Sequence, residues 1–558
     1  MPYAAPPRDF PPLAQRVLII GLDGATFDVL DPVMAAGLMP RLKAAIDSGA
    51  RGLLRSTIPP LTPAAWTTFQ TGQQPGRHGI IDFEQYDNRT GHMQFNSTRS
   101  LDHIRNIWQI LTDRGLRVGC VNIPMTYPVI PVNGFMVSGF ETPNTDSDFV
   151  YPPELKGEIL ARWPDPTVTI SWKRKALGGI ELFQKNLDYI SNSFHQGAAM
   201  SAWLGEKYGW DVLMVVLKMV DNLQHKTWKY LDPRWPNRDR PRRERAKQCF
   251  VELDKAIGKL LDYATSKGAS VMMVSDHGHG SLEGQVQPNL LLQRWGYLAL
   301  KGGGSQGATR GKYLLERMFG KRRSWKHTLD IEADLAVDHA RTRACVMHAG
   351  NAAFVYINLK GRQPTGIVDL CDYEPLRAAL SERFQSPECR IRNPEGKTIE
   401  LFPGVYKPEE VYGCTRDEQP WLPDLLLIPH DTLAVVRKIR GRSVVRWSPY
   451  RRLEGTHRHD GIFIATGPGI APQRTLKAGI IDCAPTLMAM LGLRIPAEMT
   501  GRVITDAFDR TPVVEKQVSA ATIAAAHSRA PSTAESEVYS ERELQQVTER
   551  LSDLGYLE

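Results

Sequence analysis

The sequence predicts an α/β protein with a mostly parallel central sheet that helices cover on both faces. Short, continuously apolar runs such as residues 17–21 and 269–275 are typical of strands that are buried on both sides. Helical patterns such as residues 245–266 separate these runs, and this alternation is typical of a parallel sheet. With 558 residues, the chain is long enough for one large α/β unit with insertions or for two to three domains.

The apolar runs place five expected strands along the chain, at residues 17–21, 117–121, 211–217, 269–275 and 461–465. Between them, helical periodicity is clearest at residues 104–114, 195–208 and 245–266. Open sheets of this kind bind their ligands beyond the carboxyl ends of the strands. We therefore expect the functional residues to follow the strands.

The pattern changes twice along the chain. We expect a core in two parts, residues 13–299 and 451–512, around an inserted cap region at residues 300–450. The cap region opens with three glycines, contains the basic cluster Lys321–Arg323 and has short strand patterns such as residues 353–359. Residues 513–558 form a tether and a terminal helix, in which Leu544, Val547 and Leu551 recur at helical spacing. A docking helix is favoured over an interaction helix.

Composition excludes several classes of protein. Hydrophobic residues make up 42% and charged residues 23%, which argues against a disordered, collagenous or coiled-coil chain. Lys plus Arg (69) exceeds Asp plus Glu (61) by 8, a mild excess that suits anionic substrates without indicating a nucleic-acid binder. The basic run at residues 238–247 is interpreted as a solvated helix start.

Cysteine usage and the apolar runs indicate the compartment. The seven cysteines include no C-x-x-C pair, which suits a reducing environment. The first residues lack the apolar region of a signal peptide, and the longest apolar run, residues 212–220, is short and contains Lys218. We expect a cytoplasmic protein with no membrane span.

Side chains that bind metal ions gather at four places beside the expected strands. Carboxylate and imidazole groups together suit zinc or manganese. Each motif alone has a structural explanation, such as a turn, but all four lie at the mouths of strands that we expect to be parallel. These residues are Asp23, Asp221 with His225, Asp276 with His277, and His457 with His459.

A fifth element supplies a hydroxyl. Thr62 followed by Pro63 predicts a helix start, with Thr at the N-cap and Pro at the first helical position. Thr62 could serve only as a cap. The positive end of a helix also favours an anion, and metal coordination can activate a hydroxyl as a nucleophile. Trp66, close by, is expected in the core.

The segments around these residues include, in order, GLDGATFD, PPLTPAAWTTFQTGQQPGRHGIIDF, VDNLQHKTWKY, SDHGHG and GTHRHDGIFIATGPGI. Together they resemble the alkaline phosphatase superfamily, in particular its type I phosphodiesterase/nucleotide pyrophosphatase branch and bacterial proteins described as predicted phosphohydrolases or phosphomutases. The resemblance covers most of the chain and implies an alkaline-phosphatase-like, three-layer αβα sandwich.

The resemblance also implies a site. Two divalent ions, zinc by preference and manganese as an alternative, would bind there. It implies that Thr62 is a nucleophile that forms a covalent phosphothreonine, and that the other ion ligands lie around it. One ion would be held by Asp221, His225 and His457, with His459 as the alternative to His457, and the other by Asp23, Asp276, His277 and the oxygen of Thr62. A packing or hydrogen-bonding role is expected for His78 and His279.

The expected function is that of a metal-dependent phosphoric ester hydrolase, a phosphodiesterase or pyrophosphatase, acting on a phosphorylated small molecule. The third position after Thr62 is Ala65, where nucleotide pyrophosphatases commonly have an Asn that binds a phosphoryl oxygen. The alternatives are a phosphomonoesterase or a phospho-group transferase or mutase on the same fold. A non-catalytic nucleic-acid binder that uses the basic clusters is a third hypothesis, and no nucleic-acid partner is expected.

Overall fold

The computed structural model describes residues 6–88, 90–164, 166, 179–234, 239–301, 337–414, 421–448, 454–517 and 538–554. It divides into two units. The first unit comprises Met1–Phe83, Asn96–Leu282 and Pro449–Leu557, and the second comprises Glu84–Phe95 and Glu283–Ser448. The domain boundaries expected from the sequence stay predictions.

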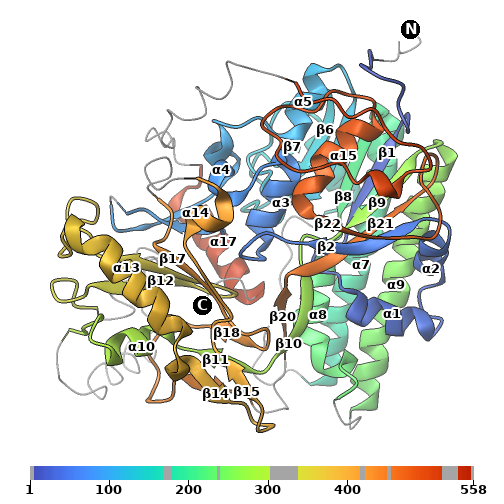
Figure 1. Ribbon diagram of the computed structural model, residues 1–558. Helices are drawn as coiled ribbons and strands as arrows, with labels where there is room; N and C mark the ends of the chain where they lie inside the picture. The colour runs from blue at the N-terminus through green and yellow to red at the C-terminus, as the bar shows by residue number, and fades with distance from the viewer. Residues whose placement is uncertain are drawn as a thin grey trace. The chain divides into compact units, whose positions relative to one another are not determined.

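A nine-stranded sheet forms the centre of the first unit (Figure 1). Five of its strands, β1, β5, β6, β8 and β9, run parallel to one another, and β2 and β22 form a further parallel pair. The order across the sheet is β22 (Arg474–Gly479), β2 (Ala50–Arg55), β21 (Asp460–Thr466), β9 (Ser270–Val274), β1 (Val17–Gly21), β8 (Val212–Val216), β5 (Val118–Ile123), β6 (Gly134–Ser138) and β7 (Val150–Tyr151).

Helices cover both faces of this sheet, because its central strands are apolar on both sides. Leu18 and Ile20 of β1 belong to one buried cluster, and Val17 and Ile19 belong to another. The first cluster includes side chains of α1 (Phe27–Ala35), α2 (Pro40–Asp47), α6 (Leu155–Arg162), α7 (Ile180–Tyr208), α8 (Met219–Leu231) and α9 (Arg240–Ser266). The second includes side chains of α3 (Thr62–Thr71), α5 (Ile107–Asp113) and α15 (Cys483–Met490). The expected three-layer αβα architecture is confirmed (Figure 1).

The direction of strand β21 differs from the expectation that the strands beside the site are all parallel. Strand β21 runs antiparallel to its neighbour β9, with Phe463 paired to Val274 and Thr466 paired to Val271. Residues that precede β21 therefore lie at the same edge of the sheet as residues that follow β9. With a parallel β21, they would have lain at the opposite edge.

Two long helices begin earlier than their strongest periodicity indicates. Helix α7 starts at Ile180 rather than near residue 195, since Leu187, Ile190 and Phe194 continue its buried face. Helix α9 starts at Arg240, where the side chain of Asp239 accepts a hydrogen bond from the backbone N–H of Arg242. The described part of the basic run is thus a charged helix start, as expected.

Smaller elements complete the first unit. They include a two-stranded antiparallel ribbon, which pairs residues far apart in the sequence, and a helix near the C-terminus. The ribbon is β10 (Gly278–Leu282) with β20 (Glu454–Arg458), and the helix is α17 (Glu541–Leu554). The unit also contains the short helices α4 (Pro75–His78), η1 (Thr98–Leu101), η6 (Ile480–Asp482) and η7 (Thr505–Ala507).

In its described residues, the second unit contains small sheets and several helices. Its four-stranded sheet is β12 (Ala344–Ala349), β13 (Ala353–Ile357), β17 (Leu425–Ile428) and β16 (Gly404–Tyr406). Its three-stranded sheet is β18 (Leu433–Val435), β11 (Gly284–Val286) and β19 (Val445–Trp447). The other elements are the hairpins β3 (Glu84–Tyr86) with β4 (Met93–Phe95) and β14 (Arg390–Arg392) with β15 (Thr398–Glu400), and α10 (Pro288–Arg294), α13 (Leu370–Gln385), η4 (Pro387–Cys389) and α14 (Pro408–Tyr412).

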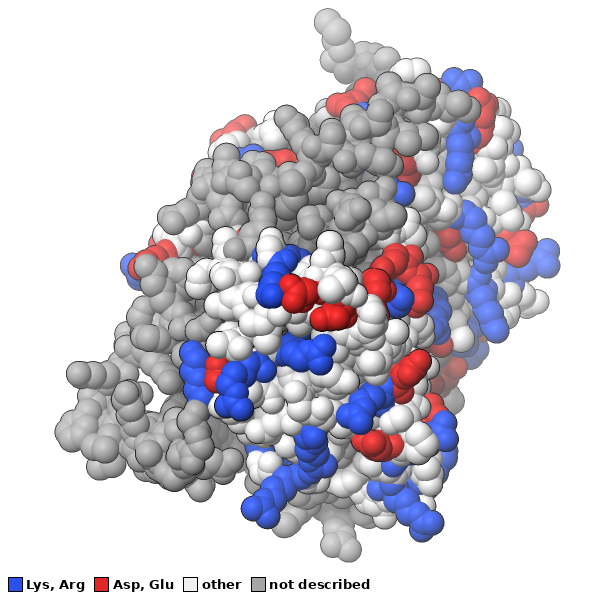
Figure 2. All heavy atoms as spheres, turned by 60° about the vertical axis from the view of Figure 1, so that its left-hand side comes forward, with Lys and Arg blue, Asp and Glu red and all other residues white. Residues whose placement is uncertain are grey.

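Two expectations from the sequence concern the basic cluster of the cap region and membrane-spanning helices. The three glycines that open the expected cap and the cluster Lys321–Arg323 lie outside the described residues. On the face drawn in Figure 2, basic and acidic side chains of the described residues are interspersed. Within the described ranges, none of the helices combines the length and the apolar character that crossing a bilayer requires.

Candidate metal centre

The predicted metal ligands lie on four segments that begin or end at neighbouring strands. Asp23 follows β1, Asp221 lies in the first turn of α8 just after β8, and Asp276 follows β9. His457 lies on β20, which leads into β21. The order β21, β9, β1, β8 places these four strands side by side. Because β21 is antiparallel, all four segments reach the same edge of the sheet.

Three of the predicted ligands form a first group. The Oδ1 atom of Asp221 lies 3.2 Å from Nε2 of His225 and 3.5 Å from Nε2 of His457. The two Nε2 atoms are 3.0 Å apart. With metal–ligand bonds of about 2.0–2.2 Å, the edges of a tetrahedral site measure about 3.4 Å. The three atoms therefore have the spacing of ligands around one ion.

Backbone carbonyls orient both imidazoles of this group. Nδ1 of His225 donates to the carbonyl oxygen of Gly455 at 2.7 Å, and Nδ1 of His457 donates to that of Pro60 at 3.1 Å. A neutral ring whose Nδ1 carries the proton presents a lone pair at Nε2. Burial lowers the pKa of His457 to about 3, so this ring is neutral. Two lone pairs at 3.0 Å repel each other unless a positive charge lies between them, and a metal ion supplies one.

The other predicted ligands form a second group around His277. Its Nε2 lies 3.3 Å from Oγ1 of Thr62, 3.4 Å from Oδ2 of Asp276 and 4.0 Å from Oδ1 of Asp23. Its Nδ1 donates to the carbonyl oxygen of Gly278 at 3.0 Å, which again leaves Nε2 as the ligand atom. The two carboxylate oxygens accept no hydrogen bond from the described residues, although both are buried. Among the described residues, the second group of possible metal ligands is Asp23, Asp221 and His277, and Asp276 lies next to it through His277.

Thr62 differs from its expected position as an N-cap. Helix α3 begins at Thr62 itself, Leu61 is the N-cap residue, and no side chain caps this end. The Thr62 hydroxyl instead faces His277 and is completely buried. Since a cap would hold the hydroxyl against its own backbone, its release from capping is what makes it available to the metal ligands.

The charge balance of the centre favours cations. Asp23, Asp221 and Asp276 are completely buried, and Lys218 is 4% exposed. When all three carboxyl groups are ionised, they outnumber the single ammonium by two charges. Burial and the nearby carboxylate of Asp276 raise the pKa of Asp23 well above its usual range. Bound cations would compensate this buried negative charge, which otherwise costs several kcal/mol.

Neighbouring residues position the carboxylates. The indole N–H of the buried Trp66 donates to Oδ2 of Asp23 at 2.9 Å, and the backbone N–H of Gly24 donates to Oδ1 of Asp276 at 3.0 Å. Gly24 has a φ of +67°, and a Cβ there would lie 3.1 Å from Oδ1 of Asp221. The glycine of the GLDG segment is therefore needed both for its backbone conformation and for the space beside the ligands.

All seven predicted site residues thus come together, and two residues join them that the sequence did not assign to the site. Nζ of Lys218 lies 2.8 Å from Oδ2 of Asp221 and 3.5 Å from Oδ1 of Asp23. The imidazole of His279 lies 3.4 Å from Oδ1 of Asp221. The available signal for Lys218 was a lysine inside an apolar run, and for His279 its position two residues after His277.

The other histidines named from the sequence lie apart from these groups. His78 is buried, and its ring contacts Oγ1 of Thr68 at 2.9 Å and accepts the N–H of Ile80 at 3.1 Å, so its hydrogen-bonding role is confirmed. Of the two histidines that precede β21, His457 belongs to the first group, and His459 belongs to neither of the possible metal-binding groups among the described residues.

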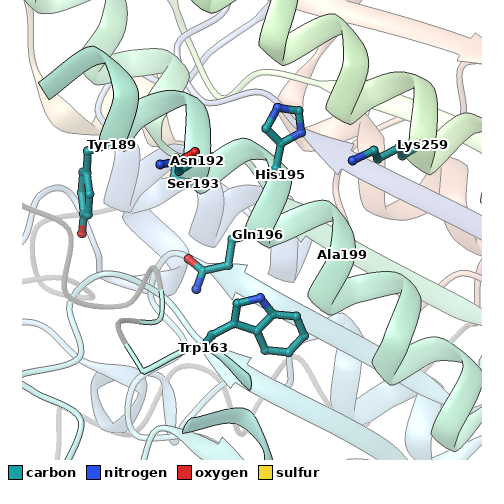
Figure 3. A pocket seen from close by; sticks show the side chains of 8 residues that line it. All are labelled: Trp163, Tyr189, Asn192, Ser193, His195, Gln196, Ala199 and Lys259. Carbon is teal, nitrogen blue, oxygen red and sulfur yellow. The ribbon is translucent and has the colours of Figure 1, made fainter. Parts of the chain in front are cut away.

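A separate cavity of about 510 Å³ lies along α7 (Figure 3). It contains none of the seven predicted site residues. Nε2 of His195, at its wall, lies 2.9 Å from Oε2 of Glu252. The lining residues are Trp163, Tyr189, Asn192, Ser193, His195, Gln196, Ala199 and Lys259.

Comparisons with known proteins identify the family to which the chain belongs. Phosphonoacetate hydrolase from Sinorhizobium meliloti 1021, solved with phosphonoformate, has a similar fold, with 16% identity, a TM-score of 0.53, and coverage of 87% of this chain and 98% of that one. Human ectonucleotide pyrophosphatase/phosphodiesterase 5 is 14% identical, with a TM-score of 0.48 and coverage of 89% and 100%. No curated protein matches the chain significantly. The model of the type I phosphodiesterase/nucleotide pyrophosphatase family matches residues 17–461. The chain belongs to this family of metal-dependent enzymes and is a phosphoric ester hydrolase.

Proposed function

We propose that this protein hydrolyses a phosphodiester or pyrophosphate bond of a small phosphorylated molecule, with Thr62 as the nucleophile. The observation that carries the proposal is the buried hydroxyl of Thr62, which lies 3.3 Å from Nε2 of His277, a member of a group of possible metal ligands. A hydroxyl that served only for capping would not be released toward such a set.

We propose two cation sites. The first uses Asp221, His225 and His457, and the second uses Asp23, Asp276, His277 and the oxygen of Thr62. Zinc suits this mixture of imidazole and carboxylate ligands, and manganese is the alternative. When bound, two such cations would neutralise negative charge on the attacking and the departing oxygen of an in-line displacement.

The protein itself positions the nucleophile. Thr62 occupies the first position of α3, where the partial positive charge of the helix end favours the ionised form of its hydroxyl. Burial of the hydroxyl excludes bulk water from the attacking atom. Oγ1 would attack phosphorus and expel the alcohol or phosphate, and water would then hydrolyse the phosphothreonine and restore the hydroxyl.

Lys218 and Trp66 support the same chemistry without touching the nucleophile. Burial alone would lower the pKa of Lys218. The nearby carboxylates of Asp221 and Asp23 outweigh this effect and raise the pKa above its usual value, so the ammonium stays charged. This charge and the indole N–H of Trp66 hold the carboxylates in place. Fixed positions matter because phosphoryl transfer depends mainly on positioning and charge stabilisation.

Ala65 occupies the place of the asparagine with which nucleotide pyrophosphatases commonly bind a phosphoryl oxygen, and its buried methyl group offers no hydrogen bond. A phosphomonoesterase and a phospho-group transferase share the first half-reaction and remain the alternatives. The seven cysteines are free thiols, which supports action in the reducing cytoplasm.

Hydrolysis of bis-(p-nitrophenyl) phosphate with zinc or manganese, before and after chelation, tests the proposal. Thr62→Ala is expected to lower kcat by at least about 10³-fold, since enzyme rate enhancements exceed about 10⁶-fold. Thr67→Ala is the matched control, because Thr67 is an equally buried threonine of the same helix whose hydroxyl has no hydrogen-bond partner among the described residues. It should retain nearly full activity.

Two outcomes would contradict the proposal separately. Full activity of the Thr62→Ala variant would exclude Thr62 as the nucleophile, and full activity after complete chelation would exclude the cations. A panel of a diester, a monoester, a pyrophosphate and a phosphonate, assayed with and without an acceptor alcohol, distinguishes the diesterase from the monoesterase and the transferase.

A further inference from the structure

We propose that His279 is a fourth protein ligand of the first cation site, so that protein atoms alone complete a tetrahedral shell there. The inference rests on the proposed function for the presence of the cation. It concerns one residue of this chain, an imidazole for which the sequence suggested only packing or hydrogen bonding.

The ribbon of β10 and β20 brings this imidazole to the site. In its antiparallel register, His279 pairs directly with His457. Side chains of directly opposed residues project from the same face of a ribbon and lie close together. The ring centre of His279 is 5.4 Å from that of His457 and 4.5 Å from that of His225. Three imidazoles therefore surround the carboxylate of Asp221.

Hydrogen bonding leaves Nε2 of His279 as a ligand atom. Nδ1 lies 3.0 Å from the carbonyl oxygen of Gly24, which can only accept, so Nδ1 carries the ring proton. Nε2 then presents a lone pair to Oδ1 of Asp221, 3.4 Å away. The ring is completely buried, and this nitrogen has no hydrogen-bond partner among the described residues. A lone pair aimed at a carboxylate oxygen is unfavourable unless a cation lies between them.

The opposite tautomer fits less well. It would place the lone pair of Nδ1 against the carbonyl oxygen of Gly24 at 3.0 Å. Its best remaining donor would be the amide of Gln224, whose Nε2 is 3.5 Å from Nδ1 and already donates to the same carbonyl at 2.7 Å. The first tautomer satisfies the carbonyl and leaves Nε2 for a metal ion, as in other metal-bound histidines.

The distances also fit four ligands. Oδ1 of Asp221 lies 3.2, 3.4 and 3.5 Å from Nε2 of His225, His279 and His457. The edge of a tetrahedron with bonds of about 2.0–2.2 Å is about 3.4 Å. The four ligand atoms all lie within 4.8 Å of one another. The spacing to His279 falls between those to the two predicted histidine ligands, so the distances fit His279 as well as they fit His225 and His457.

A fourth protein ligand would limit the access of a substrate to the ion of the first cation site. Catalytic zinc sites usually have three protein ligands and one open position, whereas sites with four protein ligands are closed. A closed first site would hold its ion more firmly than the site at Thr62. A substrate oxygen could reach that ion only as a fifth ligand. We therefore expect the substrate to make its main contact at the Thr62 site.

The test counts coordinated imidazoles in the full-length protein loaded with two cobalt(II) ions per chain. Each bound histidine that keeps its Nδ1 proton gives one hyperfine-shifted, exchangeable proton resonance in the NMR spectrum. The wild type should show four, from His225, His277, His279 and His457. His279→Asn should lose one of them, because asparagine keeps an N–H near the position of Nδ1 but has no atom at Nε2. His78→Asn, at a buried histidine outside the site, should lose none.

Chelator competition supplies a second readout. His279→Asn should bind one of its two ions at least about 10-fold more weakly. Loss of a residue that only hydrogen-bonds to a metal ligand already lowers metal affinity by about 10-fold or more. Three wild-type resonances, all retained in His279→Asn, would overturn this inference and leave the proposed function intact. Absence of any shifted resonance would overturn both. If His279→Asn failed to fold, the wild-type count of four or three would still decide.

Discussion

Replacing Lys218 by methionine tests the charge balance of the metal centre. The ammonium lies between two carboxylates, 2.8 Å from Oδ2 of Asp221 and 3.5 Å from Oδ1 of Asp23. Methionine has a similar length and fills the space without a charge. In the metal-free protein this change leaves three buried carboxylates without their only close ammonium among the described residues.

The size of the effect follows from the distances. At an effective dielectric constant of about 20, unit charges attract by about 6 kcal/mol at 2.8 Å and about 5 kcal/mol at 3.5 Å. Taking the ammonium out of water offsets much of this attraction, and removal of one partner of a buried pair typically costs about 3–5 kcal/mol. We expect the free energy of unfolding in chelator to fall by this amount. Metal affinity should rise, because the ammonium also repels bound cations.

Urea unfolding in chelator and titration with zinc measure the two effects. Lys218→Arg, which keeps the charge, should lose much less stability. Lys255→Met is the surface control, because Lys255 pairs with Glu252 at 2.9 Å but is 56% exposed, and it should cost less than about 1 kcal/mol. A loss below about 1 kcal/mol for Lys218→Met in chelator, or weaker zinc binding, would refute the electrostatic reasoning.

Three further predictions concern residues around the centre. Gly24→Ala should weaken metal binding and lower the melting temperature, because its Cβ would lie 2.8 Å from an imidazole. Gly37→Ala has a similar φ of +74° with nothing within 4 Å, so it should show only the backbone cost of about 1–2 kcal/mol; equal metal binding by the two variants would contradict the steric argument. Burial raises the pKa of Glu141 to about 7 from 4.5. As the pH rises, the Glu141 carboxyl therefore ionises at a lower pH in the unfolded chain than in the folded protein. The free energy of unfolding then falls by up to about 3 kcal/mol between about pH 4.5 and 7. Melting curves at several pH values should show Glu141→Gln gaining on the wild type over this interval, and a constant difference would exclude the shift. Trp66→Phe removes the N–H that donates to Asp23 at 2.9 Å, so it should weaken the binding of one metal ion by about 10-fold in chelator competition. Unchanged affinity would mean that the indole only fills space.

The central strands could be predicted because burial on both faces leaves a plain mark in the sequence. β1, β8 and β9 are buried at every position and appear as continuous apolar runs. Strand β2, ARGLLR, alternates between buried and more exposed positions and contains two arginines, so it gives no such run. Its place in the sheet depends on pairing with β21 and β22, which lie more than 400 residues later in the sequence.

The residues of the candidate site also include some that the sequence predicted and some that it did not. Six of its seven expected ligands are Asp or His residues that follow or precede apolar strands, and Thr62 was expected from a helix start. Lys218 and His279 escaped prediction because an isolated lysine or histidine acquires its role from its partners. Their partners are Asp23 and Asp221, which other strands bring into contact with them.

The sequence by itself determined which side chains of this protein can bind metal ions and at which ends of the apolar strands they stand, because residue type and strand polarity are local properties. Only the tertiary structure decided that β21 runs antiparallel, which brings His457 to the edge where Asp276 lies. It also decided which ring nitrogen of each histidine faces the centre. The carbonyls of Gly455 and Pro60 that orient His225 and His457 come from segments 230 and 397 residues away. Such hydrogen bonds depend on distances in space, which the order of residues does not contain.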